Sequence, residues 1–304
     1  MKEVITPFWT GICKVLPALI VTAVATTLIN SAHAELIKVG YPLNYANESV
    51  KKDMRLAISY LIKKALERDG VQVEFAFTET REETLQLLLS GRIDIAEIGG
   101  LNYATLPVDQ KALLVPCLVP QRAEEPLETY ILLGPAGETM DTLSGKRILT
   151  VRERYRGLSL AWLNSIAQGM PLVLDSCGEP SEAVLQTFFG KAQACVVSKS
   201  DFSLLCELNP QLARRLSVIA TSKPLLPLLL VHSVESASRI DVPRAIETAV
   251  HLQDTPEGQQ AFTMMKMKSF VRYSPHYVID TEDMVNGGNQ VGLAIKGGGV
   301  DNVE

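Results

Sequence analysis

Apolar strands and amphipathic helices alternate along this chain, and that alternation restricts the fold more than any other feature. Strand-like runs at residues 36–41, 71–77 and 93–98 are separated by helix-like segments at 49–68 and 81–89. In the first helical segment the apolar side chains recur with a period near 3.6, and its lysines and arginines avoid that stripe. A β-α-β-α-β order of this kind is typical of a parallel sheet with helices on its faces.

A second alternation of the same kind begins at residue 146. It predicts strands at 146–151, 172–175 and 192–198 and helices at 157–167 and 181–188. The elements expected outside the two units are strands at 113–119, 127–133, 216–221 and 224–232 and helices at 202–207, 243–252 and 257–267. Two similar units joined by extended segments predict an α/β protein of two lobes, each a mostly parallel sheet flanked by helices. A cleft between two such lobes is a common place for a small-molecule site.

The extended segments also set the predicted domain boundaries. Because the proline-rich run that begins at Pro224 reads as a second crossing strand, we expect the chain to return through it to the first lobe. We therefore predict a discontinuous first lobe, a second lobe inserted within it, and a disordered tail rich in glycine and polar residues. The corresponding ranges are 35–122 with 223–285, 123–222, and 286–304.

The first 34 residues, 1–34, read as a secretory signal peptide. An apolar run of about 15 residues follows Lys14 and precedes Ala32-His33-Ala34, which fits the small-x-small cleavage rule. The run is shorter than the roughly 20 residues of a membrane span, and an uncleaved anchor is the alternative. Cys13 lies before the apolar run, so it does not occupy the lipid-accepting position of a lipoprotein leader. We expect export to the periplasm without lipidation.

The formal net charge of −5 gives no overall attraction to nucleic acid or anionic lipid, so no nucleic-acid partner is expected. The cysteines beyond the leader are Cys117, Cys177, Cys195 and Cys206. In an oxidising compartment they could form two disulfides. Cys195 lies in an apolar run and reads as a core residue, whereas a bridge involving Cys177 or Cys206 stays open. None belongs to a Cys-x-x-Cys pair, so neither a metal site nor thioredoxin-like chemistry is expected.

The third strand of the first unit ends in a turn suited to ligand binding. It leads through Gly99 and Gly100 to Asn102 and Tyr103. Beyond the carboxyl end of a strand in an open α/β sheet, backbone N–H groups are available to a ligand. Gly100 permits a close approach of the backbone, while Asn102 and Tyr103 can supply specific contacts. The alternative is an ordinary turn from strand to helix.

Tyrosines follow the first strand of the same unit. Tyr41 and Tyr45 could stack on an organic ligand or donate a hydroxyl, and Asn44 lies between them. Packing of these tyrosines at the rim of the lobe is the alternative. Weaker candidates are the polar residues that end or follow other strands, namely Thr78, Thr80, Ser176, Ser198 and Asp201.

Three arginines alternate where the first strand of the second unit ends. If the strand geometry persists, Arg152, Arg154 and Arg156 share one side, with Glu153 and Tyr155 opposite. An arginine at this place could hold a carboxylate or a phosphate through two parallel hydrogen bonds. The alternative is that they are surface arginines paired with Glu153 or with solvent.

Five segments in order resemble the periplasmic substrate-binding proteins of phosphate, phosphite and phosphonate ABC transporters. They are Ile-Lys-Val-Gly-Tyr at 37–41, Leu-Leu-Ser-Gly-Arg-Ile-Asp-Ile-Ala at 88–96, Asp-Thr-Leu-Ser-Gly-Lys-Arg-Ile at 141–148, the Ser-Lys-Pro-Leu-Leu-Pro run within 216–227, and Thr-Pro-Glu-Gly at 255–258 followed by Ser-Phe at 269–270. The resemblance covers about 36–277. It implies the type 2 periplasmic-binding fold, with a small solute held between two lobes and passed to an ABC permease.

One segment departs from the family pattern. In typical phosphonate-binding members, a turn rich in serine and threonine holds the anionic head at the start of the second lobe. Here Val151-Arg-Glu-Arg-Tyr-Arg-Gly157 occupies that place. The resemblance therefore implies a small, anionic ligand bearing a phosphonate, phosphate or carboxylate, without choosing among them.

We predict an exported solute-binding receptor that is a monomer, has a membrane permease or sensor protein as partner, and uses no cofactor, metal or catalytic residue. The nucleophile-elbow, phosphate-loop and zinc-protease motifs are absent from the sequence. One alternative is a periplasmic module that senses a ligand for a membrane sensor kinase. Another is an enzyme on the same fold, a dehydratase or lyase, for which Glu179 and Asp201 are the nearest candidate acids or bases.

Overall fold

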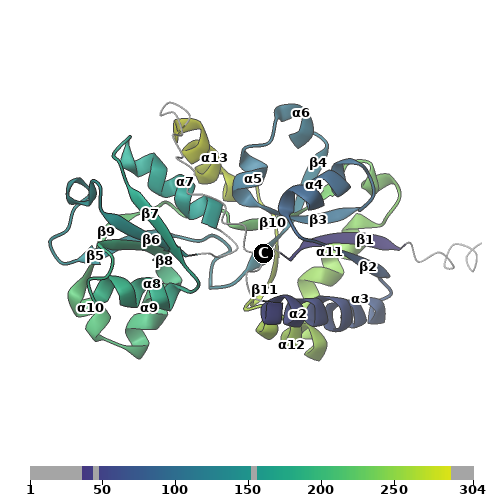
Figure 1. Cartoon of the computed structure of the whole chain (residues 1–304). Coiled ribbons are helices and arrows are strands. Elements are labelled where there is room, and N and C mark those ends of the chain that lie inside the picture. The colour runs from purple at the N-terminus through teal and green to yellow at the C-terminus, as the bar shows by residue number, and fades with distance from the viewer. Residues whose placement is uncertain (1–35, 44–47, 152–155, 289–304) are drawn as a thin grey trace, which may run out of the picture.

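The computed structural model describes residues 36–43, 48–151 and 156–288, and it contains two sheets that lie side by side, each flanked by helices (Figure 1). The six-stranded sheet has the order β11-β4-β10-β3-β1-β2. Its strands are β1 (Ile37–Pro42), β2 (Val73–Thr78), β3 (Ile95–Gly99), β4 (Leu114–Gln121), β10 (Leu228–Ser233) and β11 (Ser269–Arg272). We call this sheet and the helices around it the six-stranded lobe.

The other sheet has five strands in the order β7-β6-β8-β5-β9. They are β5 (Tyr130–Pro135), β6 (Arg147–Val151), β7 (Val173–Cys177), β8 (Ala194–Ser198) and β9 (Leu216–Thr221). This sheet and its helices form the five-stranded lobe. The predicted α/β fold with two sheets flanked by helices is confirmed.

Each sheet combines a parallel trio with antiparallel strands. β1 pairs in parallel with β2 and β3, and β6 pairs in parallel with β7 and β8. β10 and β5 run antiparallel to their neighbours in the two sheets. The expectation of mostly parallel sheets therefore holds for the two trios only. β5 and β10 follow segments that cross between the sheets, so they start at the edge where the trios end and run in the opposite direction.

The helices before the first crossing are α2 (Glu48–Leu56), η1 (Ala57–Ile62), α3 (Lys63–Arg68), α4 (Arg81–Leu89), α5 (Gly100–Ala104) and α6 (Val108–Lys111). Those of the five-stranded lobe are η2 (Asp141–Leu143), α7 (Arg156–Ala167), α8 (Pro180–Phe188), α9 (Lys199–Leu208) and α10 (Gln211–Arg215). The remainder are η3 (Ser236–Ser238), α11 (Val242–Val250), η4 (His251–Asp254), α12 (Pro256–Met264) and α13 (His276–Gly288). The helix predicted at 49–68 is thus observed as one helical run, in which the π-helical segment η1 separates α2 from α3.

Two chain segments connect the lobes, and they pair with each other. The backbone N–H groups of Glu128 and Leu225 each donate to the other residue's carbonyl oxygen at 2.8 Å. Nearby, the Ser222 hydroxyl oxygen accepts the N–H of Tyr130 at 2.8 Å. The six-stranded sheet therefore takes its strands from two separate stretches of chain, one before and one after the five-stranded sheet. The predicted boundaries at residues 122 and 222 remain a prediction.

Two elements near the end of the described chain differ from the sequence-based expectation. Residues 269–270, which follow the helix predicted at 257–267 and for which no strand was predicted, begin β11, which pairs with β4 at the edge of the sheet. α13 was not expected, and it continues through residues 286–288 of the predicted tail. Both elements depend on distant partners, because β11 is short and α13 packs against α5 and α7. Local periodicity is a weak signal for such elements.

α13 contacts both lobes, through α5 on the six-stranded side and α7 on the five-stranded side. Glu282 pairs with Lys111 and Asp280 with Lys223, both at 2.7 Å, and the Thr281 hydroxyl accepts the N–H of Leu226 at 2.9 Å. Met284 packs in an apolar cluster that also contains Leu101 of α5. No helix within the described residues is long and apolar enough to span a bilayer.

The cysteines beyond the leader are all described, and each is a free thiol, so the disulfides left open by the sequence are not formed. Cys195 is fully buried in β8, which confirms its prediction as a core residue.

Candidate functional site

The carboxyl ends of the two parallel trios face each other. β1 runs from the outer side of the six-stranded lobe toward the five-stranded lobe (Figure 1). At the facing edge, α5 follows β3 and α7 follows β6, and these two helices are in contact. A Cβ placed on Gly157 of α7 would lie only 3.4 Å from Cδ2 of Leu101 in α5. The facing edges are therefore the place where a molecule would touch both lobes.

The Gly99-Gly100 turn lies at this edge, and Gly100 has a packing role there. Its N–H donates to the carbonyl oxygen of Pro227 at 3.0 Å. A Cβ on Gly100 would lie 1.9 Å from the carbonyl oxygen of Leu226, a distance that no side chain tolerates. Glycine is thus required because the chain entering β10 passes against this turn. Its predicted contact with a ligand stays a prediction.

Asn102 and Tyr103 occupy different surroundings in α5. Asn102 is half-buried, and its Oδ1 atom folds back to 2.6 Å from the place a Gly99 Cβ would occupy. Tyr103 is 7% exposed, and its ring lies 5.1 Å from the Lys111 ammonium. Burial, reinforced by the charge of Glu282, raises the pKa of the Tyr103 phenol. Tyr103 therefore packs where α5, α6 and α13 meet, which leaves its ligand role a prediction.

Tyr41 is also buried, and it lines a cavity of about 80 Å³ inside the six-stranded lobe. This cavity lies between the sheet and the elements η1, α3, α11 and η4, and it is lined almost entirely by apolar side chains. Cys117 is one of the lining residues, and burial raises the pKa of its thiol to about 12. The cavity belongs to the core of one lobe and not to the space between the lobes.

Two charged residues near the facing edge were not identified from the sequence. Arg81 is the first residue of α4, and its Nε and Nη2 atoms are shielded from solvent. Its Cδ atom lies 3.8 Å from the place a Gly99 Cβ would take, so the side chain lies across the turn between β3 and α5. Glu97, two residues before Gly99, is 3% exposed. An acid within the apolar run 93–98, which also contains Asp94, was a usable signal for Glu97, whereas Arg81 looked like any first residue of a surface helix.

The polar residues that follow β2 cap α4. Thr80 is the N-cap, and its hydroxyl accepts the N–H of Glu83 at 3.1 Å. The buried Thr78 hydroxyl bonds to that of Thr84 at 2.5 Å. These contacts satisfy donors at the start of the helix.

At the facing edge of the five-stranded lobe, Ser198 caps α9. Its hydroxyl accepts the N–H of Asp201 at 3.0 Å and donates to the Asp201 carboxylate at 2.7 Å. Ser200 in turn donates to Glu128 Oε1 at 2.9 Å. Burial is the largest cause of a raised pKa at Glu128, and the negative charge of Asp201 adds to it. Asp201 thus takes part in the cap of α9, and Glu128, which lies beside it, was not among the residues predicted for the site.

Several predicted ligand residues lie outside the described residues, namely Asn44, Tyr45, Arg152, Arg154 and Tyr155. Arg156 begins α7, and only its backbone is described. The roles of these residues stay predictions. Among the residues that are described, no group of three histidine, cysteine or acidic side chains could hold a metal ion.

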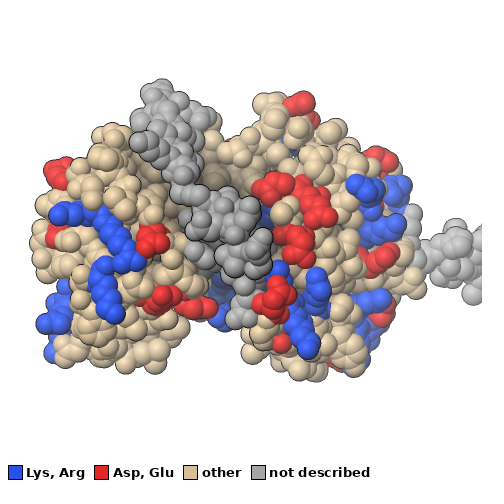
Figure 2. Space-filling model, in the orientation of Figure 1, with Lys and Arg blue, Asp and Glu red and all other residues tan. Residues whose placement is uncertain are grey.

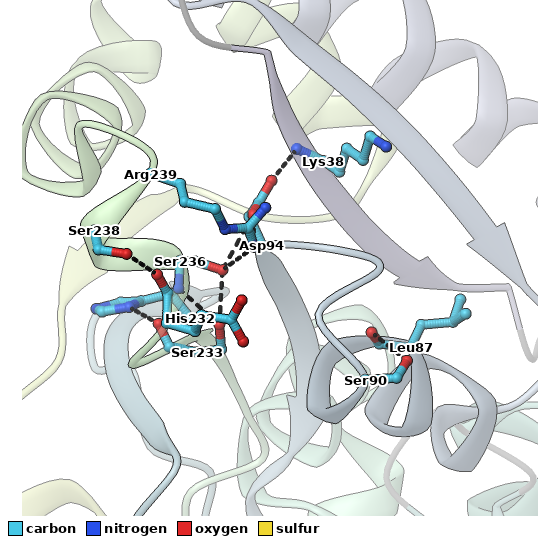
Figure 3. Close-up of polar contacts among 10 residues, drawn as sticks. Lys38, Leu87, Ser90, Asp94, His232, Ser233, Ser236, Ser238 and Arg239 are labelled. Atoms are coloured by element: carbon cyan, nitrogen blue, oxygen red, sulfur yellow. Dashed lines mark hydrogen bonds and ion pairs between the residues drawn. The ribbon is translucent and has the colours of Figure 1, made fainter.

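Asp94 lies in the Gly-Arg-Ile-Asp-Ile-Ala segment at 91–96, which leads into β3. It is therefore at the amino end of β3, opposite to the Gly99-Gly100 turn (Figure 3). Its carboxylate is 3% exposed and accepts the backbone N–H of Lys38 at 2.9 Å. It also accepts the Ser236 hydroxyl at 3.1 Å and the Arg239 guanidinium at 3.0 Å. Asp94 therefore joins β3 to β1 and to the turn after β10, which is a structural role.

On the face drawn in Figure 2, basic and acidic side chains are mixed over both lobes. The chain as a whole is acidic, with a formal net charge of −5. An anion at the facing edges would therefore have to be held by nearby groups, since no general positive field attracts it.

A sequence model of the family described as "ABC transporter, phosphonate, periplasmic substrate-binding protein" matches residues 39–277. No curated protein matches the chain.

Solved structures show the same fold. A Xanthomonas citri protein bound to ATP has a TM-score of 0.61 at 12% identity, covering 84% of this chain and 98% of that one. PhnD1 from Prochlorococcus marinus in complex with methylphosphonate has a TM-score of 0.58 at 14% identity, covering 85% and 100%. A binding protein component of an ABC phosphonate transporter from Pseudomonas aeruginosa has a TM-score of 0.54 at 12% identity, covering 84% and 87%.

Proposed function

Because this chain belongs to the family of periplasmic substrate-binding proteins of phosphonate ABC transporters, we propose that it captures a small anion between its lobes and delivers it to a membrane permease. The family consists of substrate-binding proteins and not of enzymes. The family match, which spans strands of both sheets, is the observation that carries the proposal.

The ligand proposed here bears a phosphonate, phosphate or carboxylate group. PhnD1, which shares the fold, was solved with methylphosphonate. In this chain Arg81 already brings a positive charge to the facing edge, and Arg152, Arg154 and Arg156 lie just before or at the start of α7. Guanidinium groups form paired, charge-assisted hydrogen bonds with all three kinds of anion.

The predicted contacts come from both lobes. Tyr41, Asn44, Tyr45, Gly100, Asn102 and Tyr103 are proposed for the six-stranded lobe, and Arg152, Arg154, Tyr155 and Arg156 for the five-stranded lobe. Binding would favour the state in which the lobes are closed, because only that state offers both sets of contacts. The permease would then recognise the closed form. We further propose that residues 1–34 direct export to the periplasm and that the protein acts as a monomer.

Calorimetric titration with methylphosphonate, inorganic phosphate, phosphite and acetate tests this function. We expect at least one of them to bind with one-to-one stoichiometry, to raise the melting temperature and to be recovered chemically unchanged. Tyr103→Ala and Arg154→Ala should each weaken that binding while the variants stay folded. If no member of the panel binds, or if the bound compound is converted, the proposal is wrong.

A further inference from the structure

We propose that the cavity inside the six-stranded lobe is a binding site for a small apolar molecule, of the size of a xenon atom or a short hydrocarbon. The cavity has a volume of about 80 Å³ and lies between the sheet and the elements η1, α3, α11 and η4. Because it belongs to the core of one lobe, this site is independent of the anion site, and the inference goes beyond the proposed function.

The first argument is the size of the cavity. A single water molecule needs roughly 10–15 Å³ of such a space. The volume of about 80 Å³ is several times larger, so the close packing of the lobe is interrupted here. A dry cavity of about 150 Å³ with an aliphatic and aromatic lining binds benzene or xenon. The smaller cavity of this lobe therefore suits a guest of a few heavy atoms.

The second argument is the chemistry of the lining. Among the described residues that line the cavity, Tyr41, Glu97 and Cys117 have polar side chains. The Cys117 thiol donates to the carbonyl oxygen of Leu230 at 3.2 Å, and Tyr41 and Glu97 also have partners within the chain. A buried water molecule needs roughly two to four polar partners, so this lining favours an apolar guest over water.

The third argument is that two side chains in the middle of the sheet are incompletely covered. β1 lies between β2 and β3, and β10 lies between β3 and β4. Val39 of β1 and Leu230 of β10 are nevertheless only half-buried, and both line the cavity. A guest would cover this apolar surface and gain dispersion contacts with both side chains.

The helical wall of the cavity has an unusual geometry at the same place. Ile58 and Ile62 line the cavity from the π-helical segment η1. Segments of π-helix are rare and are frequently found at functional sites. Met265 and Met267 also line the cavity, and their unbranched side chains adapt to the shape of a guest. The wall therefore combines a rigid sheet with elements that can adjust to a bound molecule.

Methyl NMR of the full chain under increasing pressure of xenon and, separately, of ethane tests the inference. We expect saturable shifts of the methyl signals of Ile58, Ile62 and Leu230. The signals of Ile148 and Leu149, which are fully buried in the five-stranded lobe, should not change. Because the guest binds only the folded protein, it should also raise the melting temperature relative to helium at the same pressure.

Ala249→Leu is the blocking variant, because Ala249 lines the cavity and a leucine there would occupy it. It should abolish both the shifts and the gain in melting temperature. Ala213→Leu is the matched control, since Ala213 is exposed in α10 of the other lobe, and it should bind the probes as the wild type does. If Ala249→Leu does not fold, Ala245→Leu, at another lining alanine, takes its place.

Absence of saturable shifts at Ile58, Ile62 and Leu230 in the wild type overturns the inference. The same shifts in a folded blocking variant also overturn it, because the probe would then bind elsewhere. So does an equal loss in Ala213→Leu, which would mean that any added leucine suppresses the signal. None of these measurements uses an anion, so this inference and the proposed function can each fail while the other stands.

Discussion

The two ends of the six-stranded sheet both shield a charged group from water, but they do so in different surroundings. At the amino end of β3, Asp94 accepts hydrogen bonds from a backbone amide, a hydroxyl and a guanidinium of this chain (Figure 3). At the other end, Arg81 lies across a Gly-Gly turn close to the contact between the lobes. The two ends of β3 therefore have different charged neighbours, and only the carboxyl end lies where a ligand could join both lobes.

The bonding of Asp94 explains why its end of the sheet is structural. Its donors come from β1, from η3 and from Arg239, which are far apart in the sequence. A buried carboxylate with several donors stabilises the fold, because the cost of its burial is offset by charge-assisted hydrogen bonds. Replacing it should disturb several segments without touching the facing edges.

The largest expected effect is that of Asp94→Ala. We expect it to lower the free energy of unfolding by about 3 kcal/mol, because it leaves buried donors without an acceptor. Ligand affinity of the folded fraction should stay as in the wild type. Urea unfolding and calorimetry of the same preparation measure the two quantities. A clear loss of affinity with normal stability would contradict the division between the two ends.

Thr281→Val tests how α13 is fastened at the carboxyl end. Thr281 is fully buried, and its hydroxyl accepts the N–H of Leu226 at 2.9 Å. Valine keeps the shape of threonine but leaves the buried Leu226 N–H without an acceptor, so the free energy of unfolding should fall by about 2 kcal/mol. Thr281→Ser, which keeps the acceptor, is the control and should lose less. Equal losses in both variants would show that the methyl group matters more than the hydrogen bond.

Ala249→Leu changes the core of the six-stranded lobe, where the cavity of about 80 Å³ lies. Ala249 is one of its lining residues, and filling such a cavity should raise the free energy of unfolding by about 1 kcal/mol. Affinity for the ligand should not change, because the cavity belongs to the core of one lobe. Thermal unfolding and titration measure both. A fall in stability would mean that the added side chain does not fit the cavity.

The smallest expected effect concerns Glu128 in the other lobe. The pKa of Glu128 is raised above the ordinary value of 4.5, and burial of the carboxyl group is the main cause. The folded state then holds its proton to higher pH than the unfolded state. At a pH below the unfolded-state pKa, Glu128 is protonated in both states and its burial costs the folded protein the least free energy. Its contribution to stability declines as the pH rises through the folded pKa.

Glu128→Gln removes this titration and should flatten that decline. Urea unfolding of both proteins from about pH 4 to about pH 8 checks it. A decline of the same slope in the variant would assign the pH dependence to another group.

Individual residues show how far the sequence could lead. The carboxyl-edge turn at Gly99 and Gly100 was found from its strand and its glycines, and the structure places it where α5 and α7 meet. The same reasoning expected Gly100 to admit a ligand, whereas the carbonyl oxygen of Leu226 already requires a glycine there. Arg81 carried no local signal, because its burial depends on β3 and α5 folding beside it.

The amino-acid pattern was enough to predict the order of strands and helices in the two β-α-β-α-β units and the family to which the chain belongs. These properties follow from local periodicity and from motifs a few residues long. Three properties appear first in the folded protein: which charged side chains are shielded from solvent, the antiparallel direction of β5 and β10, and the packing of α13 against helices of both lobes. Each of these depends on contacts between segments far apart in the chain, and a pattern read along the chain does not contain such contacts.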